Sequence, residues 1–198
     1  VPTDPDADEV RDQAVAALVR AGDRSNRTGS PRRAADSYVS AAELLREGQR
    51  EDADVQAADL LERAAAAALD GMLAPRAVEL ADQAATIYAR AGQTRSAARS
   101  TSVAGRALRL SGRHTEARER LTAAVEALSD NPDADTVRAL QQLAGLEVFA
   151  GTADAGRVTE EAVVLAQRLA LEQDDLSGVF GIRAVWLTQN GRRPEAIA

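Results

Sequence analysis

The chain has 198 residues, of which 45% are hydrophobic and 28% charged, and its formal net charge at pH 7 is −7. This composition excludes an intrinsically disordered chain, and the acidic balance argues against a nucleic-acid-binding surface as the main role. Cysteine and lysine are both absent, which excludes disulfides, thiolate chemistry and a Walker A phosphate loop. Without an apolar run of about 18 residues or an N-terminal signal pattern, we expect a cytoplasmic protein that contacts no membrane.

Small and apolar residues recur with a period of about 3.6 along nearly the whole chain, which predicts helices throughout. An acidic lead-in at 1–7 precedes them, and Ser129–Asp133 is the clearest turn. Nine helices are expected. Five of them run from Asp8 to near Gly29, Pro31 to Gly48, about Asp54 to Asp70, Pro75 to Gly92 and about Thr94 to Gly112. The sixth holds Ala117, Leu121, Ala124 and Leu128, and the last three run from Asp135 to Ala150, about Ala153 to Leu171, and Asp174 or Asp175 to Asn190. A tenth begins at Arg192, and no segment alternates with period two for long enough to predict a strand.

Glycines end the first helix of each successive pair at regular intervals. They are Gly29, Gly71, Gly112, Gly151 and Gly191, spaced by 42, 41, 39 and 40 residues. The pattern Gly-Arg-x-x-Glu-Ala occurs at Gly112 and again at Gly191. A regular period in this range is typical of a helical repeat array.

Small residues recur at fixed distances from each turn glycine. One lies seven residues before the glycine, and two lie five and twelve residues after it. A larger residue lies nine residues after the glycine. Such a pattern lets the two helices of a pair pack closely. In the first pair these residues are Gly22, Ala34, Ala41 and Tyr38, and in the third pair they are Gly105, Ala117, Ala124 and Leu121. The second and fourth pairs carry the pattern shifted by one residue in opposite directions, as Ala77, Ala81 and Ala84 and as Ala155, Thr159 and Ala162.

This pattern resembles the tetratricopeptide (TPR) repeat. Gly22, Gly29, Ala34, Tyr38 and Ala41 match five of that family's consensus positions, and the third pair matches with Leu121 in place of the aromatic residue. The sequence departs from the family in its longer period of about 40 residues and in replacing the early tryptophan by Leu18, Leu60, Thr101, Leu140 and Phe180. The resemblance implies an all-α, right-handed α-solenoid of antiparallel helix pairs with nine or ten helices. We expect residues 1–198 to form a single repeat domain of a larger protein, with repeats at about 8–48, 53–92, 94–130, 134–172 and a truncated 174–198.

The resemblance also implies a concave groove lined by the first helix of each pair. The polar residues at the family's groove positions are Asp23, Asn26, Arg27, Arg99, Ser102, Arg106, Arg109, Arg138, Gln141, Thr188 and Gln189. Within this set an arginine cluster (Arg99, Arg106, Arg109 and Arg138) is suited to a carboxylate or an acidic peptide. The alternative is a solvated face whose arginines pair with neighbouring acids. Val19 and Asp23 stand where the family's clamp for chaperone tails would begin, which argues against that ligand.

The sequence contains no recognisable set of catalytic residues. The only histidine, His114, follows a turn glycine, where an exposed helix start is the simpler interpretation. Most of the acidic clusters fall at helix starts, where they suit the helix dipole. We therefore expect no enzyme, no metal site and no cofactor. Phe180 fits the buried face of its helix, whereas Trp186 falls off that face and is expected to pack rather than to stack on a ligand.

The functional hypothesis is a protein-interaction scaffold within a multidomain signalling or transcriptional regulator, because the long-period variant looks like arrays in large actinobacterial-type signalling proteins. Its partner would be a protein or peptide, or a neighbouring domain of the same protein, and not nucleic acid. The alternative is a small-molecule sensor that gates an ATPase, cyclase or DNA-binding module. A third alternative is a homodimer through the C-terminal helices, with Val179, Ile182 and Val185 on an exposed apolar surface.

Overall fold

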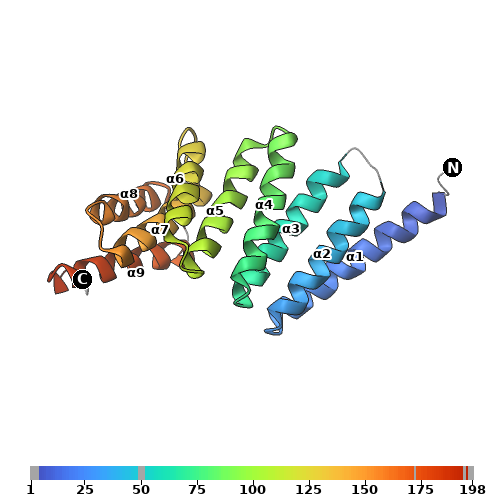
Figure 1. Ribbon diagram of the computed structural model, residues 1–198, viewed down its shortest axis with the longest axis horizontal. Helices are drawn as coiled ribbons and strands as arrows, with labels where there is room; N and C mark the ends of the chain where they lie inside the picture. The colour runs from blue at the N-terminus through green and yellow to red at the C-terminus, as the bar shows by residue number, and fades with distance from the viewer. Residues whose placement is uncertain (1–4, 49–51, 172, 194, 196–198) are drawn as a thin grey trace. The chain divides into compact units, whose positions relative to one another are not determined.

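The computed structural model describes residues 5–48, 52–171, 173–193 and 195 (Figure 1). Helices are the only regular secondary structure within these ranges. The chain divides into two compact units, one ending at Ser111 and the other beginning at Gly112, and each is described by itself. The first unit contains α1 (Pro5–Arg27), α2 (Pro31–Glu47), α3 (Ala53–Asp70), α4 (Ala74–Arg90) and α5 (Thr94–Leu110). The second contains α6 (His114–Leu128), α7 (Ala134–Ala150), α8 (Ala155–Arg168) and α9 (Gln173–Gln189).

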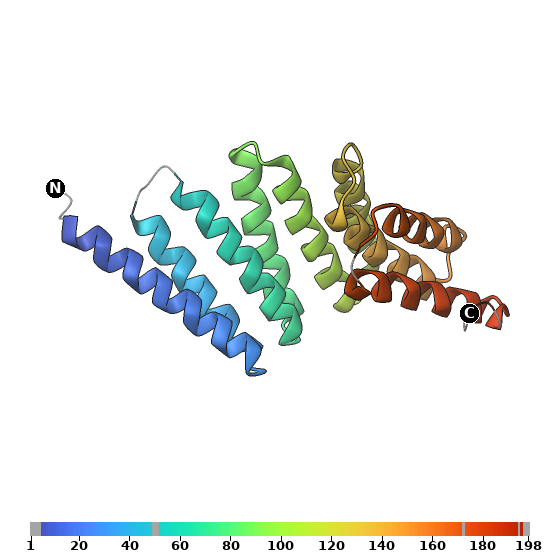
Figure 2. The same cartoon turned by 180° about the vertical axis from the view of Figure 1, so that it is seen from behind.

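Consecutive helices within each unit are packing neighbours. In the first unit each of α1 to α5 lies against the next, as both views show (Figures 1 and 2). In the second unit α7 packs against α6 and α8, and α9 packs against both α7 and α8. The predicted all-α fold built from antiparallel helix pairs is confirmed.

Glycine in the left-handed region forms most of the tight turns. Gly112 has a φ of 77°, and Gly29, Gly92, Gly151 and Gly191 have φ values between 65° and 75°. An L-residue with a side chain is disfavoured at such φ values, which is why a helix so often ends just before a glycine. The repeated glycine in the sequence therefore marks the turn between two helices.

The second hairpin turn differs from the sequence prediction. Its left-handed residue is Met72, with φ 59°, whereas Gly71 has φ −80°. Counted from Met72, the small residues Ala77, Ala81 and Ala84 fall five, nine and twelve positions later, which are the offsets of the first and third pairs. The one-residue shift of the second pair disappears because its turn residue is Met72 and not the predicted Gly71.

The core of the first unit is built mainly from alanine and leucine, with two tyrosines as the largest fillers. Tyr38 is only 3% exposed and Tyr88 1%. A Cβ on Gly22 would lie 2.5 Å from the ring carbon Cε1 of Tyr38, so α1 and α2 approach this closely only with glycine at that position. The glycine seven residues before the turn thus accommodates the aromatic ring nine residues after it.

The second unit has a core of longer aliphatic side chains, including Val137, Leu140, Leu146 and Leu187. Trp186 packs against Gly156, since a Cβ there would lie 2.6 Å from the ring carbon Cζ2 of Trp186. The tryptophan thus joins α9 to α8, which agrees with its expected packing role.

Two expectations for α9 are wrong. Phe180 is 39% exposed, although it was expected on the buried face, and Val179 is 2% exposed, although it was expected on an open apolar surface. Neighbouring residues on a helix point about 100° apart, so only one of the two can face the core. Packing against both α7 and α8 selects the face of Val179 and Leu187, while Ile182 and Val185 are half-buried.

Some helix boundaries also differ from those predicted from the sequence. α1 begins at Pro5, inside the expected lead-in, and α8 ends at Arg168 because Ala170 adopts a left-handed φ of 48°. The expected tenth helix lies largely outside the described residues. The single-domain assignment and its repeat limits stay a prediction.

Candidate functional site

A groove crosses the first helices of successive pairs in the first unit. It has a volume of about 500 Å³ and receives side chains mainly from α1, α3 and α5, with Leu45 added from α2. Apolar groups and charged groups share its surface, which we call the first-unit groove: Val15, Val19, Leu45, Gln56, Asp59, Leu60, Glu62, Arg63 and Arg99. Such a mixture suits a ligand with both apolar and polar groups.

The charges of this groove are partly paired with each other. Arg99 Nε donates to Glu62 Oε1 at 2.6 Å, and the hydroxyl of the buried Ser100 donates to Glu62 Oε2 at 2.6 Å. Glu62 on α3 therefore holds two consecutive residues of α5. This pairing is the alternative that the sequence left open for Arg99, namely an arginine that neutralises a neighbouring acid.

A second hollow lies beside the C-terminal half of α1 and brings together three predicted site residues, Asp23, Asn26 and Arg27. Its volume is about 550 Å³, and Tyr38 and Arg63 complete its polar wall; we call it the Asp23 hollow. Asp23 Oδ1 accepts a hydrogen bond of 2.7 Å from the Tyr38 hydroxyl and also pairs with the guanidinium of Arg63. Arg63 additionally lies over the Tyr38 ring, 4.3 Å from its centroid.

These contacts shift the ionisation of both partners. The hydrogen bond from Tyr38, aided by the charge of Arg63, holds the pKa of Asp23 below its ordinary value despite some desolvation. Burial raises the pKa of Tyr38, and the carboxylate that it contacts raises it further. At neutral pH the site therefore contains an ionised aspartate, a neutral tyrosine and an arginine.

Arg63 was missed at the sequence level because it is not at one of the family's groove positions. It lies 40 residues after Asp23, which is one repeat period. That separation, between an acid and an arginine on consecutive first helices, is the signal that could have identified the pair.

Tyr88 makes a similar contact in the next hairpin. Its hydroxyl donates to Asp59 Oδ1, and burial together with this carboxylate raises its pKa. Asp59 also lines the first-unit groove. Each buried tyrosine thus fixes an acid on the preceding helix.

The other predicted site residues of the first unit lie further along α5. Ser102 is half-buried and Arg106 is exposed. Burial lowers the pKa of Arg109, and the neighbouring positive charge of Arg106 lowers it further. The charge of Arg106 therefore lies close enough to Arg109 to disfavour the charged form of the Arg109 guanidinium.

The remaining predicted residues belong to the second unit. Arg138 pairs with Asp135 one turn earlier, at 3.0 Å. Gln141 packs closely against Gly178 of α9, where a Cβ would lie 2.3 Å from its Nε2 atom. Thr188 and Gln189 are exposed at the end of α9. Whether the predicted arginine cluster includes Arg138 stays a prediction.

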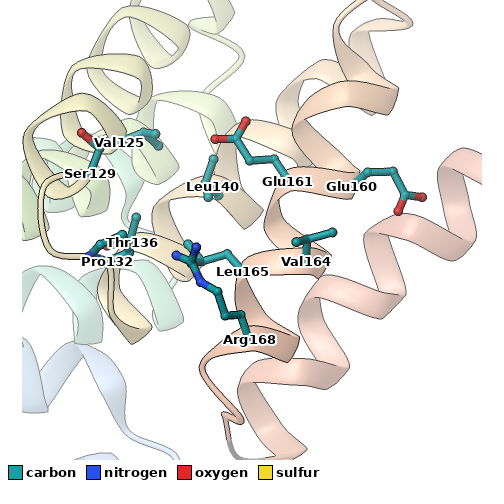
Figure 3. Close-up of a pocket in the computed structure, with 10 residues that line it drawn as sticks. All are labelled: Val125, Ser129, Pro132, Thr136, Leu140, Glu160, Glu161, Val164, Leu165 and Arg168. Atoms are coloured by element: carbon teal, nitrogen blue, oxygen red, sulfur yellow. The ribbon is translucent and has the colours of Figure 1, made fainter.

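The second unit has its own hollow, which the sequence did not indicate. It has a volume of about 430 Å³ and lies where α6, α7 and α8 meet. Figure 3 shows the residues that line it, which we call the second-unit trough: Val125, Ser129, Pro132, Thr136, Leu140, Glu160, Glu161, Val164, Leu165 and Arg168. Glu161 and Arg168 reach over it, whereas Glu160 points away toward α9 and pairs with Arg183 at 2.9 Å.

A buried ion pair holds α6 against α7. Glu147 is 4% exposed, and its carboxylate accepts from Arg118 Nε at 2.6 Å and from the Thr152 hydroxyl at 2.6 Å. Burial opposes the ionisation of Glu147, but the hydrogen bonds from Arg118 and Thr152 outweigh it and lower its pKa. This contact is structural, because every part of it is satisfied within the unit.

Within the described residues, no group of three or more histidine, aspartate or glutamate side chains is arranged to hold a metal ion. The same part of the chain contains no helix whose length and apolar character would let it cross a membrane.

Comparison with known proteins identifies the fold. No protein-family model matches the sequence, and no curated protein matches it. A solved structure of nearly identical TPR-like repeats, attributed to a kinesin light chain from Podosopora anserina, is similar with a TM-score of 0.72 and 19% identity, over 92% of this chain and 89% of that one. BtubC from P. vanneervenii is similar with a TM-score of 0.66 and 16% identity, over 94% of this chain and 86% of that one.

The apo form of RapI is also similar, with a TM-score of 0.80 and 14% identity. The match covers 94% of this chain but 51% of RapI, so the chain spans about half the length of that protein. At these identities the likeness concerns the fold alone. The fold is a TPR-like array of antiparallel helix pairs, as the sequence pattern predicted.

Proposed function

We propose that this protein is a non-catalytic interaction scaffold that binds an extended peptide segment of a partner protein in the first-unit groove. The observation that carries the proposal is that one groove crosses α1, α3 and α5 and combines an apolar surface with charged side chains. An extended segment crossing several helices can place alternate side chains against Val15, Val19 and Leu60 and its backbone against polar groups. TPR-like arrays present such surfaces because each hairpin contacts only its neighbours and the array repeats.

The arginines of the first unit favour an acidic partner segment. Arg27 and Arg63 line the Asp23 hollow, and Arg106 adds its charge beside Arg109 on α5. Bidentate pairing of guanidinium groups with carboxylates provides both orientation and energy. Because Arg63 and Arg99 already pair with Asp23 and Glu62, Arg27 and Arg106 are the arginines most suited to recognise a ligand.

The test uses a library of random 12-residue peptides displayed on phage, with selected sequences then measured by fluorescence anisotropy. We expect acidic sequences with spaced apolar residues to be enriched. The Val19→Glu and Arg106→Glu variants should each weaken the selected peptides about tenfold, because Val19 lines the groove and Arg106 lies two helical turns beyond the groove residue Arg99 on the same face of α5. Arg33→Glu, an exposed arginine at the opposite end of α2 from the groove residue Leu45, is the matched control. Equal binding to all four proteins, or enrichment without acidic residues, would contradict the proposal.

A second candidate is an effector sensor, favoured by the Asp23 hollow. A volume of about 550 Å³ with several converging polar groups is within the range of small-molecule sites. A panel of small carboxylates (succinate, citrate and glutamate) provides a direct test. Under this alternative, thermal stabilisation by one of them would be lost in Arg27→Ala, whereas no stabilisation by any of the three would count against the sensor.

We also propose that the scaffold is part of a multidomain signalling or transcriptional regulator in the cytoplasm. The resemblance of the long-period pattern to arrays in large bacterial signalling proteins supports this context. Sequencing the reading frame on both sides of these residues tests it. An adjoining ATPase, cyclase or DNA-binding module is the expected result, and its absence would leave a free-standing interaction scaffold.

A further inference from the structure

The second-unit trough has fixed walls. The hydroxyl of Thr136 donates to the carbonyl of Leu128 at 3.3 Å, which joins the start of α7 to the end of α6. Asp133 caps α7 by accepting from the backbone amides of Asp135 and Thr136. On the other side, the Glu160–Arg183 pair joins α8 to α9. The trough is therefore largely formed before any ligand arrives, which reduces the ordering cost of binding.

The surface of the trough is mostly apolar and partly open to solvent. Leu140 and Leu165 are buried beneath it, while Val164 on its rim has 61% of its surface exposed. A single exposed apolar side chain is ordinary on a protein surface. Here it borders a hollow of about 430 Å³ whose lining is also apolar, so that one continuous apolar surface reaches solvent.

Two opposite charges on α8 bracket this surface. Glu161 and Arg168 are seven residues apart on one helix, or about 10 Å along its axis at 1.5 Å per residue. Both side chains reach across the trough (Figure 3). Glu161 retains Arg157 as a partner at 3.3 Å, and no hydrogen bond or ion pair of Arg168 occurs within the described part of the chain.

We propose that this trough docks an amphipathic helix of a partner protein, lying antiparallel to α8. Its apolar side chains, three or four residues apart, would contact Val125, Leu140 and Val164. An acidic residue would pair with Arg168, and a basic residue seven positions later would pair with Glu161. The antiparallel orientation follows from the helix dipole, because it places the acid nearer the N-terminus of the bound helix and the base nearer its C-terminus.

A helix fits this surface better than a small ligand does. A small molecule binds tightly when about 70–90% of its surface is covered, and the exposed rim at Val164 leaves one side of the trough open. A helix lying between the ridges of α6 and α8 can insert side chains into the trough while its other face stays in solvent. The two charges then specify its direction and register. This site is in the second unit and does not depend on the peptide groove of the first.

The probe is a synthetic amphipathic peptide of about 18 residues, long enough to form a helix, with leucines three or four apart and a Glu seven residues before an Arg. A second peptide exchanges the Glu and the Arg. Binding is measured by fluorescence anisotropy and mapped by backbone amide chemical shifts. We expect the first peptide to bind about tenfold more tightly than the exchanged one, with shifts confined to α6, α7 and α8.

Two variants complete the test. Val164→Asp should weaken the first peptide about tenfold or more. Arg168→Glu should weaken it by a similar factor and should regain affinity for a peptide in which the Glu is replaced by Arg. Val10→Asp, which alters an equally exposed valine on α1, should leave binding unchanged. Circular dichroism checks that all variants keep their helices.

Equal affinities for the two peptides, or no effect of Val164→Asp, would overturn the docking proposal. Shifts on α1 and α3 would also overturn it, since they would place the peptide in the first-unit groove. Failure here leaves the proposed groove function intact, because that proposal is tested by Val19 and Arg106 in the other unit.

Discussion

At the scale of single residues, Met72 shows how one backbone angle sets the register of a hairpin. It occupies the left-handed position that glycine fills at the neighbouring turns, and its side chain is 88% exposed. The side chain therefore makes almost no packing contacts that could offset the free-energy cost of its left-handed φ. Gly71 lies one residue earlier, but its φ of −80° is one that any residue can adopt.

Replacing this residue should stabilise the protein. We expect Met72→Gly to raise the free energy of unfolding by roughly 0.5–1 kcal/mol, because relief of the left-handed strain exceeds the added entropy of the unfolded chain. Gly112→Ala is the opposite change, with φ 77°, and should destabilise by about 1–2 kcal/mol. Urea unfolding measures both. A loss of stability in Met72→Gly would show that the side chain contributes packing after all.

The ionised Asp23 should make stability depend on pH in the acid range. Its folded-state pKa lies below the ordinary value of 3.8, so its contribution is complete above that value and is lost as pH falls through the folded pKa. We expect Asp23→Asn to be destabilising at pH 6 and the difference from the unaltered protein to shrink as the pH falls through the folded-state pKa. Tyr38→Phe should reduce the same pH dependence, because it removes the hydrogen bond that lowers this pKa. Parallel pH profiles for the unaltered protein and Asp23→Asn would contradict the assignment.

At the scale of elements, each unit uses polar contacts at the edges of the apolar faces to join its helices. Glu62 holds α5 to α3, Asp23 joins α2 and α3, and Glu147 joins α6 to the turn after α7. Alanine-rich faces allow close approach but bury little area per residue. Hydrogen-bonded charges at their edges add specificity to the pairing of helices.

Breaking the buried pair in the second unit should be costly. Removing Arg118 leaves the carboxylate of Glu147 buried without its main partner, and we expect Arg118→Ala to destabilise by about 2 kcal/mol, below the usual range for buried pairs because Arg118 itself is 41% exposed. The double change with Glu147→Gln should recover part of this loss. A double-mutant cycle gives the coupling energy. A coupling near zero would reduce the pair to an incidental surface contact.

The close approach of α8 and α9 at Gly156 is a second element-scale test. Gly156→Ala improves helix propensity but forces Trp186 to move, so we expect a net loss of about 1–2 kcal/mol. Trp186→Leu should restore part of it in the double variant. Trp186 is the only tryptophan, so its fluorescence reports on this contact directly. An unchanged emission spectrum and unchanged stability in Gly156→Ala would show that the ring can shift freely.

At the scale of the whole molecule, the prediction of one repeat domain has a measurable consequence. Trp186 fluorescence reports on the second unit alone, while far-ultraviolet circular dichroism reports on helices of both units. A single cooperative array is expected to give the same urea midpoint by both signals. Two separate midpoints would divide the chain into independently unfolding units.

The candidate site was less predictable from the sequence than the fold was. Asp23, Asn26 and Arg27 line one hollow because they lie close together on one helix, where spacing alone fixes their relation. Arg63 was missed, and Arg99 proved to be paired with Glu62, because both contacts join residues about 40 positions apart in sequence. A helical period indicates which face a residue occupies, but it does not identify which residue of another helix it contacts.

The trough of the second unit gave no signal in the sequence for the same reason. In the sequence, Val164 and Glu161 look like ordinary surface residues of a helix. They line a hollow only because α6, α7 and α8 meet beside them. Likewise, the choice between Val179 and Phe180 as the buried residue depended on α9 packing against two helices at once.

The sequence by itself determined the helical fold, the helix pairing and most of the turns, because these follow from local rules: the period of small residues, the backbone freedom of glycine and proline at helix starts. Only the tertiary structure decided that Met72 forms the second turn, that Arg99 is neutralised by Glu62 and that a trough opens beside Val164. These features depend on how the helices approach one another in space, and that approach is set by the joint packing of many side chains rather than by any local pattern.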